Sequence, residues 1–131
     1  MNDSGPFKLT HQRTWIALGV MIIAAIWIFS LIPNPPHIGV EGEDKAGHFV
    51  AYGIMMLWWS QILVRSRDRL IIAAAFVAMG IAIEFVQGWT GWRTFEVADM
   101  IADAIGVALG WGIACTPAGT ILARFENAIL N

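Results

Sequence analysis

The sequence predicts an all-α integral membrane protein whose helices form a four-helix bundle in one domain. Its composition points to this class, because hydrophobic residues make up 57% of the 131 residues and charged residues only 14%. Soluble domains typically carry about 25% charged residues, so an ordinary soluble domain is excluded, as is a disordered chain. The formal net charge of −2 leaves no basic surplus to meet phosphates, and no nucleic-acid partner is expected.

Four segments are apolar enough to cross the bilayer core, which takes roughly 20 helical residues. They cover about residues 15–32, 46–64, 70–87 and 98–115, within a membrane domain at 15–123. The fourth span either continues past Pro117 to Ala123 or is followed by a separate surface helix over 118–130. The first span is not expected to be a cleaved signal peptide, because its apolar run is longer than the apolar region of such peptides.

The charges of the connecting segments predict the orientation of the spans. Arg65, Arg67 and Arg69 lie in the second connection, whereas the first connection, 33–45, carries three acidic residues against one lysine. Cytoplasmic loops carry the excess of lysine and arginine. We therefore expect the terminal segments 1–14 and 124–131 and the arginine-rich connection in the cytoplasm, and the other two connections on the outer side.

Ionisable residues inside the spans collect at one depth. Glu84 lies about 21 Å along the third span from its cytoplasmic start, roughly 9 Å below the outer surface. Asp99 and Asp103 begin the fourth span, and His48 begins the second, also near the outer side. Ionisable groups in a membrane are costly and mark functional sites by default. A polar pocket open to the outer side is therefore expected.

Small residues recur along the fourth span and predict where it packs closely. They occupy every fourth position and include a GxxxG pattern: Ala98, Ala102, Gly106, Gly110 and Ala114. Small residues let helices approach closely in lipid. Asp99 and Asp103 share a helix face with Gly106 and Gly110, so we expect this acidic face to point into the bundle.

The residue types in the expected pocket suit an amphipathic anionic ligand. Arginine binds phosphate through two parallel hydrogen bonds. Arg93 and Lys45 are therefore expected either to bracket a lipid phosphate or the phosphate of a lipid-linked glycan, or to anchor the helix ends at the membrane interface. The candidate ligand-binding residues are Asp44, Lys45, His48, Tyr52, Glu84, Gln87, Arg93, Asp99 and Asp103. Membrane lipids are the expected surroundings.

Several of these residues have a structural interpretation as well. Glu84 and His48 are either hydrogen-bonded groups that hold helices together or general acid–base groups. Asp99 and Asp103 are either helix N-terminal carboxylates paired with a basic residue or a pair that shares a proton. No cofactor or metal is expected, because one histidine among carboxylates is a poor zinc set and no HExxH motif is present.

Three short motifs resemble those of the VanZ-like family of small integral membrane proteins. They are DKAGHF at 44–49 with Tyr52, EFVQ at 84–87, and RTFEVAD at 93–99 followed by Gly106 and Gly110. Their order and spacing are similar to the family pattern over residues 44–110. The family usually shows asparagine where this chain has Asp103, which adds a negative charge beside Asp99.

The resemblance implies a multi-pass protein of the bacterial inner (cytoplasmic) membrane, linked to sensitivity to glycopeptide antibiotics. Three functions stay open. The first is a binding pocket for the anionic ligand, and the second is an accessory subunit of a membrane complex or a homo-oligomer. The third is an intramembrane hydrolase or transferase that uses Glu84 and His48. An enzyme is the less favoured class, because Ser30, Ser60 and Cys115 lie away from the polar residues and no known nucleophile motif is present.

Overall fold

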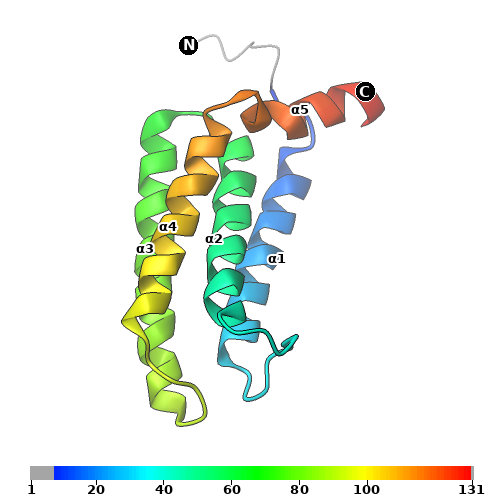
Figure 1. Cartoon of the computed structure of the whole chain (residues 1–131). Helices are drawn as coiled ribbons and strands as arrows, with labels where there is room; N and C mark the ends of the chain where they lie inside the picture. Colours follow the sequence, from blue (N-terminus) through cyan, green and yellow to red (C-terminus); the bar gives the residue numbers. More distant parts are fainter. Residues whose placement is uncertain (1–7, 131) are drawn as a thin grey trace.

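The computed structural model describes residues 8–130, and Figure 1 shows four long helices that run alongside one another. They are α1 (Gln12–Leu31), α2 (Glu43–Ile62), α3 (Ser66–Thr90) and α4 (Val97–Ala114). Within the described residues there is no strand. The all-α class is therefore confirmed, and the arrangement is consistent with the predicted four-helix bundle.

Three of the four helices, α1, α3 and α4, are long and apolar enough to cross a membrane. Their outward faces carry large exposed apolar side chains such as Met21, Ile71 and Ile101, which suits contact with lipid. The helix α2 is as long as α1 but less apolar, because charged residues fill its first turn and polar side chains follow. It packs most extensively against α4, so its polar face lies inside the bundle.

Two glycines let α4 lie directly against the backbone of α2. A Cβ atom built on Gly106 would collide with the carbonyl oxygen of Phe49, and one built on Gly110 would collide with the carbonyl oxygen of Gly53. Only a residue without a side chain fits at either position. Close packing at the predicted GxxxG pattern is thus what sets the separation of these two helices.

The rest of the small-residue ladder does not follow this contact along its whole length. Ala114 is buried and Ala102 half-buried, but Ala98 is exposed. Four residues turn an α-helix by about 40° more than one full turn, so a ladder with this period drifts around the helix. The small-residue face was predicted to pack closely from Ala98 onward. In the structure Ala98 lies outside that face, and the close packing begins further along α4.

The chain turns after α4 and forms a separate helical segment over residues 117–130. It consists of η1 (Pro117–Thr120), α5 (Ile121–Phe125) and η2 (Glu126–Leu130). Figure 1 shows this segment lying across the end of the bundle at which the chain enters α1. Of the two alternatives for the chain past Pro117, the structure contains the separate segment.

The buried carboxylate of Glu126 holds this segment to the start of α1. It accepts hydrogen bonds from the backbone amides of Thr10 and His11 and, at 2.5 Å, from the indole Nε1 of Trp15. The first amides of a helix lack backbone partners. The Glu126 carboxylate supplies acceptors for the amides of Thr10 and His11 at the start of α1.

Candidate functional site

Four ionisable side chains from three helices meet inside the bundle. We call this set the polar cluster: His48 of α2, Glu84 of α3, and Asp99 and Asp103 of α4. The three carboxylic residues are at most 5% exposed. The close contact of Gly106 and Gly110 with α2 brings His48 against Asp99 and Asp103. The structure therefore brings together four of the residues predicted to form the pocket.

His48 lies between the two aspartates. Its Nδ1 is 2.9 Å from Asp103 Oδ1, which is hydrogen-bond distance, and its Nε2 is 3.7 Å from Asp99 Oδ2. With the Nδ1 proton donated to Asp103, the Nε2 lone pair faces the remaining carboxylates. An imidazole oriented in this way can accept a proton or coordinate a cation.

Glu84 connects the end of α3 to the start of α4. Its Oε2 accepts a hydrogen bond of 2.9 Å from the backbone amide of Glu96, the residue that precedes α4. Its Oε1 has no hydrogen-bond partner among the described residues, and the same is true of Asp103 Oδ2 and the Tyr52 hydroxyl. Buried polar atoms are usually satisfied, so several orphaned oxygens in one region require an explanation.

Lys45 forms the solvent-facing rim of the polar cluster. Its Nζ lies 2.7 Å from Glu96 Oε2 and 3.7 Å from Asp99 Oδ1. Both Lys45 and Glu96 are substantially exposed, so this contact is weak. Asp44 is exposed on the first turn of α2.

Arg93 and Gln87 face α1 and not the polar cluster. The amide of Gln87 donates to the Ser30 carbonyl oxygen at 2.8 Å. The guanidinium of Arg93 makes only long hydrogen bonds of 3.4 Å to the carbonyl oxygens of Phe29 and Ile32. No carboxylate described by the structure lies within ion-pair distance of Arg93.

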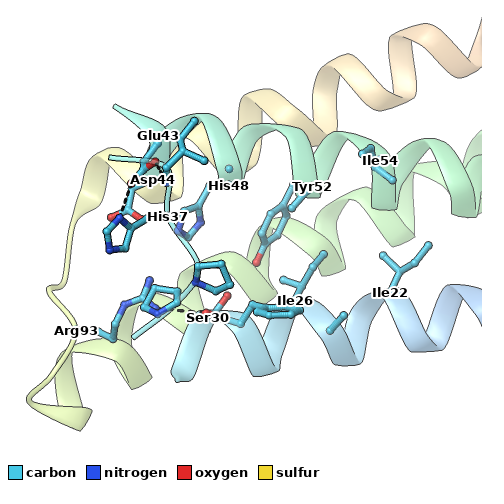
Figure 2. Close-up of a pocket in the computed structure, with 17 residues that line it drawn as sticks. Ile22, Ile26, Ser30, His37, Glu43, Asp44, His48, Tyr52, Ile54 and Arg93 are labelled. Atoms are coloured by element: carbon cyan, nitrogen blue, oxygen red, sulfur yellow. Dashed lines mark hydrogen bonds and ion pairs between the residues drawn. The ribbon is translucent and has the colours of Figure 1, made fainter. Parts of the chain in front are cut away.

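The larger of two cavities at this end of the molecule lies between α1, α2 and their connection and has a volume of about 610 Å3. Its wall is mostly apolar and includes Ile22, Ile26, Phe29, Pro35, Ile38 and Ile54. Figure 2 shows the Tyr52 ring projecting from α2 toward α1, with Arg93 and His37 at the end near the loops. His48 and Asp44 also line it, so one cavity combines a long apolar wall with a charged end.

A smaller cavity of about 430 Å3 shares Arg93, Glu43 and Asp44 with the larger one. Asp99, Glu96 and Thr94 line it together with residues of the α1–α2 connection. Arg93 thus lines both cavities, of which the larger reaches His48 and the smaller Asp99.

Sequence reasoning missed the contribution of α1. That helix has no ionisable side chain inside the bundle, but its last carbonyl oxygens receive hydrogen bonds from Gln87, Arg93 and the Trp92 indole. The last carbonyls of any helix lack backbone partners, and Pro33 marks that end in the sequence. His37, whose Nδ1 lies 3.6 Å from Glu43 Oε1, carried no recognisable signal.

Comparison with known proteins assigns the chain to a family. The model of the VanZ/LLP1 family matches residues 6–122. An uncharacterized protein of Schizosaccharomyces pombe is 30% identical over 106 residues, which cover 79% of this chain and 62% of that relative. The chain therefore spans less than two thirds of the relative's length, and no solved structure matches it significantly. With the family pattern matched over most of its length, this chain belongs to the VanZ/LLP1 family.

Proposed function

We propose that the chain is a membrane protein that binds an amphipathic ligand with a phosphate group, such as a lipid phosphate or a lipid-linked glycan. The proposed site is the cavity between α1 and α2. The observation that carries the proposal is that Arg93, without a carboxylate partner in the described structure, stands at the end of this apolar cavity.

The surroundings of Arg93 favour an anion. Its guanidinium carries five N–H donors, and the two long contacts to α1 carbonyl oxygens leave most of them free. Arginine binds phosphate with two parallel hydrogen bonds, and these are strong because both partners are charged. A phosphate at this position would leave its hydrocarbon chain along Ile22, Ile26 and Phe29.

The acidic residues at the same end favour a glycan on the phosphate. Glu43 and Asp44 line the same cavity as Arg93. Ionised carboxylates accept hydrogen bonds from hydroxyl groups, so they suit the sugar of a lipid-linked glycan whose phosphate lies at Arg93.

The charge pattern of the connections supports an outer-leaflet position for this site. With Arg65, Arg67 and Arg69 in the cytoplasm, both termini are cytoplasmic and the α1–α2 connection faces outward. In a bacterium the protein would then lie in the inner membrane, where a site for lipid-linked glycan would affect glycopeptide sensitivity as the family resemblance implies.

Binding of a defined probe tests the proposal. Native mass spectrometry of the full chain in detergent should show one bound farnesyl phosphate and much weaker binding of farnesol, which lacks the phosphate. Arg93→Ala should weaken farnesyl phosphate binding at least tenfold, since a charge-assisted hydrogen bond contributes about 1.5–3 kcal/mol. Arg67→Ala, at the opposite end of the bundle, is the matched control. Equal binding of both probes, or no effect of Arg93→Ala, would overturn the assignment.

The pairing of His48 with Asp103 favours one alternative, an intramembrane hydrolase or transferase. A general base is commonly held in position by a carboxylate, and His48 Nδ1 has that contact. In this alternative His48 or Glu84 activates a water or a hydroxyl group. Release of phosphate or of an alcohol from a lipid-linked substrate, lost in His48→Gln, would support catalysis over simple binding.

A further inference from the structure

We propose that the polar cluster binds a divalent metal cation through His48, Glu84 and Asp99, with Asp103 orienting the histidine. This site is distinct from the anion site at Arg93, and the inference does not depend on the proposed function. The sequence by itself predicts no metal here. The inference comes from how the fold brings the three residues together.

The three residues present one ligand atom each in a small volume. These atoms, one imidazole nitrogen and two carboxylate oxygens, all lie within 4.8 Å of one another. Ions such as zinc bind these donors at about 2.0–2.2 Å in tetrahedral geometry, so two neighbouring donors lie about 3.4 Å apart. Side-chain rotations that draw the more widely separated donors together would bring all three atoms to bonding distance of one ion.

The hydrogen bond of His48 to Asp103 supports metal coordination. Metal-binding histidines usually donate their second ring N–H to a carboxylate or carbonyl, which fixes the tautomer and the ring orientation. Here the bond of 2.9 Å engages Nδ1 and leaves Nε2 directed at Asp99. The Nε2–Oδ2 distance of 3.7 Å is too long for a hydrogen bond, but it suits two ligands of the same ion.

The charge balance of the polar cluster also calls for a cation. Glu84, Asp99 and Asp103 bring three nearly fully buried carboxylates to one place. Lys45 approaches only Asp99, and it shares its charge with Glu96. Burying unpaired carboxylates is costly unless a cation or a metal compensates them. A divalent cation supplies that compensation.

An orphaned atom points to the same ligand independently. Glu84 is 0% exposed, and its Oε1 has no partner among the described residues, whereas its Oε2 accepts the hydrogen bond from the Glu96 amide. This leaves a buried oxygen of Glu84 free in the cluster, as a metal ligand requires.

The ligand atoms indicate which ions would bind, and the two cavities provide routes to the site. One imidazole with two carboxylates suits Mn2+ and holds Zn2+ less tightly than a set with more imidazole or thiolate ligands, whereas the soft ion Cu(I) prefers sulfur. Three protein ligands leave at least one position for water or another oxygen ligand. His48 lines the larger cavity and Asp99 the smaller one, so an ion has paths of entry from both.

Metal content and stability of the full chain test this inference. After EDTA treatment in detergent, addition of Mn2+ or Zn2+ should raise the thermal unfolding temperature saturably, with one equivalent bound by elemental analysis. Mg2+ and Ca2+ added at the same concentration should give the smaller shift. An unchanged unfolding temperature and no bound metal would overturn the proposal and leave a network of protonated carboxylates.

Variants separate a metal site from a structural role. Glu84→Gln and Asp99→Asn should weaken binding of Mn2+ or Zn2+ at least tenfold. In EDTA they should unfold no earlier than the wild type, because each removes a buried negative charge. Glu43 is a half-buried carboxylate at the same end of the bundle as the polar cluster. Glu43→Gln is therefore the matched control and should bind metal as the wild type does. Equal metal binding by the wild type and by the Glu84→Gln, Asp99→Asn double variant would contradict the site.

The metal site and the anion site are separable by a further variant. Arg93→Ala should leave the metal-induced shift unchanged while it weakens binding of farnesyl phosphate. Loss of both properties in Arg93→Ala would contradict two distinct sites.

Discussion

The imidazole of His48 and the carboxylate of Asp103 face each other across the contact of α2 with α4, with Nδ1 2.9 Å from Oδ1. The pair lies close to the point where Gly106 meets the backbone of α2 at Phe49. The small residues that bring the helices together and the polar residues between them therefore work as one unit. A side chain at Gly106 would change the separation of the helices and with it the hydrogen bond.

Asp103→Asn tests what the extra negative charge of this chain does. Asparagine keeps an oxygen that can accept the His48 hydrogen bond and removes one buried charge. We expect an unfolding temperature in detergent, without added metal, that is equal to or higher than that of the wild type. Asp103→Ala leaves the histidine N–H unpaired and should cost about 1–3 kcal/mol. If both variants lose the same stability, the hydrogen bond is not what Asp103 contributes.

Gly106→Ala should destabilise the protein through the contact of α2 with α4. The added methyl group meets the Phe49 carbonyl oxygen, which belongs to helix backbone and cannot move aside. Overpacking of this kind typically costs about 1–3 kcal/mol or more. Chemical unfolding in detergent measures it.

The same helix supplies the control for that prediction. Nothing lies within 4 Å of a Cβ built on Gly112, and alanine favours a helix over glycine by about 0.8–1 kcal/mol. Gly112→Ala should therefore be neutral or stabilising. Equal losses in the two variants would show that close packing at Gly106 is not the cause.

Glu126 makes the attachment of the C-terminal segment dependent on pH. Burial alone would raise the pKa of this carboxyl, but hydrogen bonds from the Trp15 indole and the Thr10 and His11 amides outweigh it and lower the pKa to about 2, from a usual value of 4.5. A lowered folded-state pKa contributes stability that is present above pH 4.5 and lost as the pH falls through about 2. The indole N–H resonance of Trp15 should report the transition, and Glu126→Gln should abolish it. A resonance that does not respond to acid would contradict the contact.

The single cysteine offers a test of membrane orientation. Cys115 is exposed just after α4, at the end predicted to be cytoplasmic. A maleimide that cannot cross membranes should label it only after cells are permeabilised. In a Cys115→Ser background, Val40→Cys in the exposed α1–α2 connection should be labelled in intact cells. The reverse pattern would invert the topology and place the cavity in the cytoplasmic leaflet.

Much of the fold could be predicted because it rests on composition and helical period. The apolar runs indicated the helices, and counting residues from the span ends placed Glu84 near the depth of Asp99 and His48. The close approach at Gly106 and Gly110 also followed from the spacing of small residues. Each of these features follows from the order of residues within one segment of the chain.

The missing details depend on contacts between distant segments. Which nitrogen of His48 meets Asp103 depends on the rotation of α2 about its axis, which packing and not spacing sets. Glu84 binds the backbone amide of Glu96, a contact that any residue except proline could make at position 96. Arg93 turns to the carbonyl oxygens of α1 because the α3–α4 connection folds toward that helix end, and no motif encodes that direction.

Binding of a phosphate-bearing lipid is best tested by identifying the molecules that stay bound to the protein when it is taken from its native membrane. The full chain, purified gently without overexpression, should carry a recurrent lipid with a phosphate group, by mass spectrometry, and Arg93→Ala should lose that lipid while Arg67→Ala keeps it. A fixed set of partner proteins with no enriched lipid would contradict the binding-site account and would support an accessory subunit of a membrane complex.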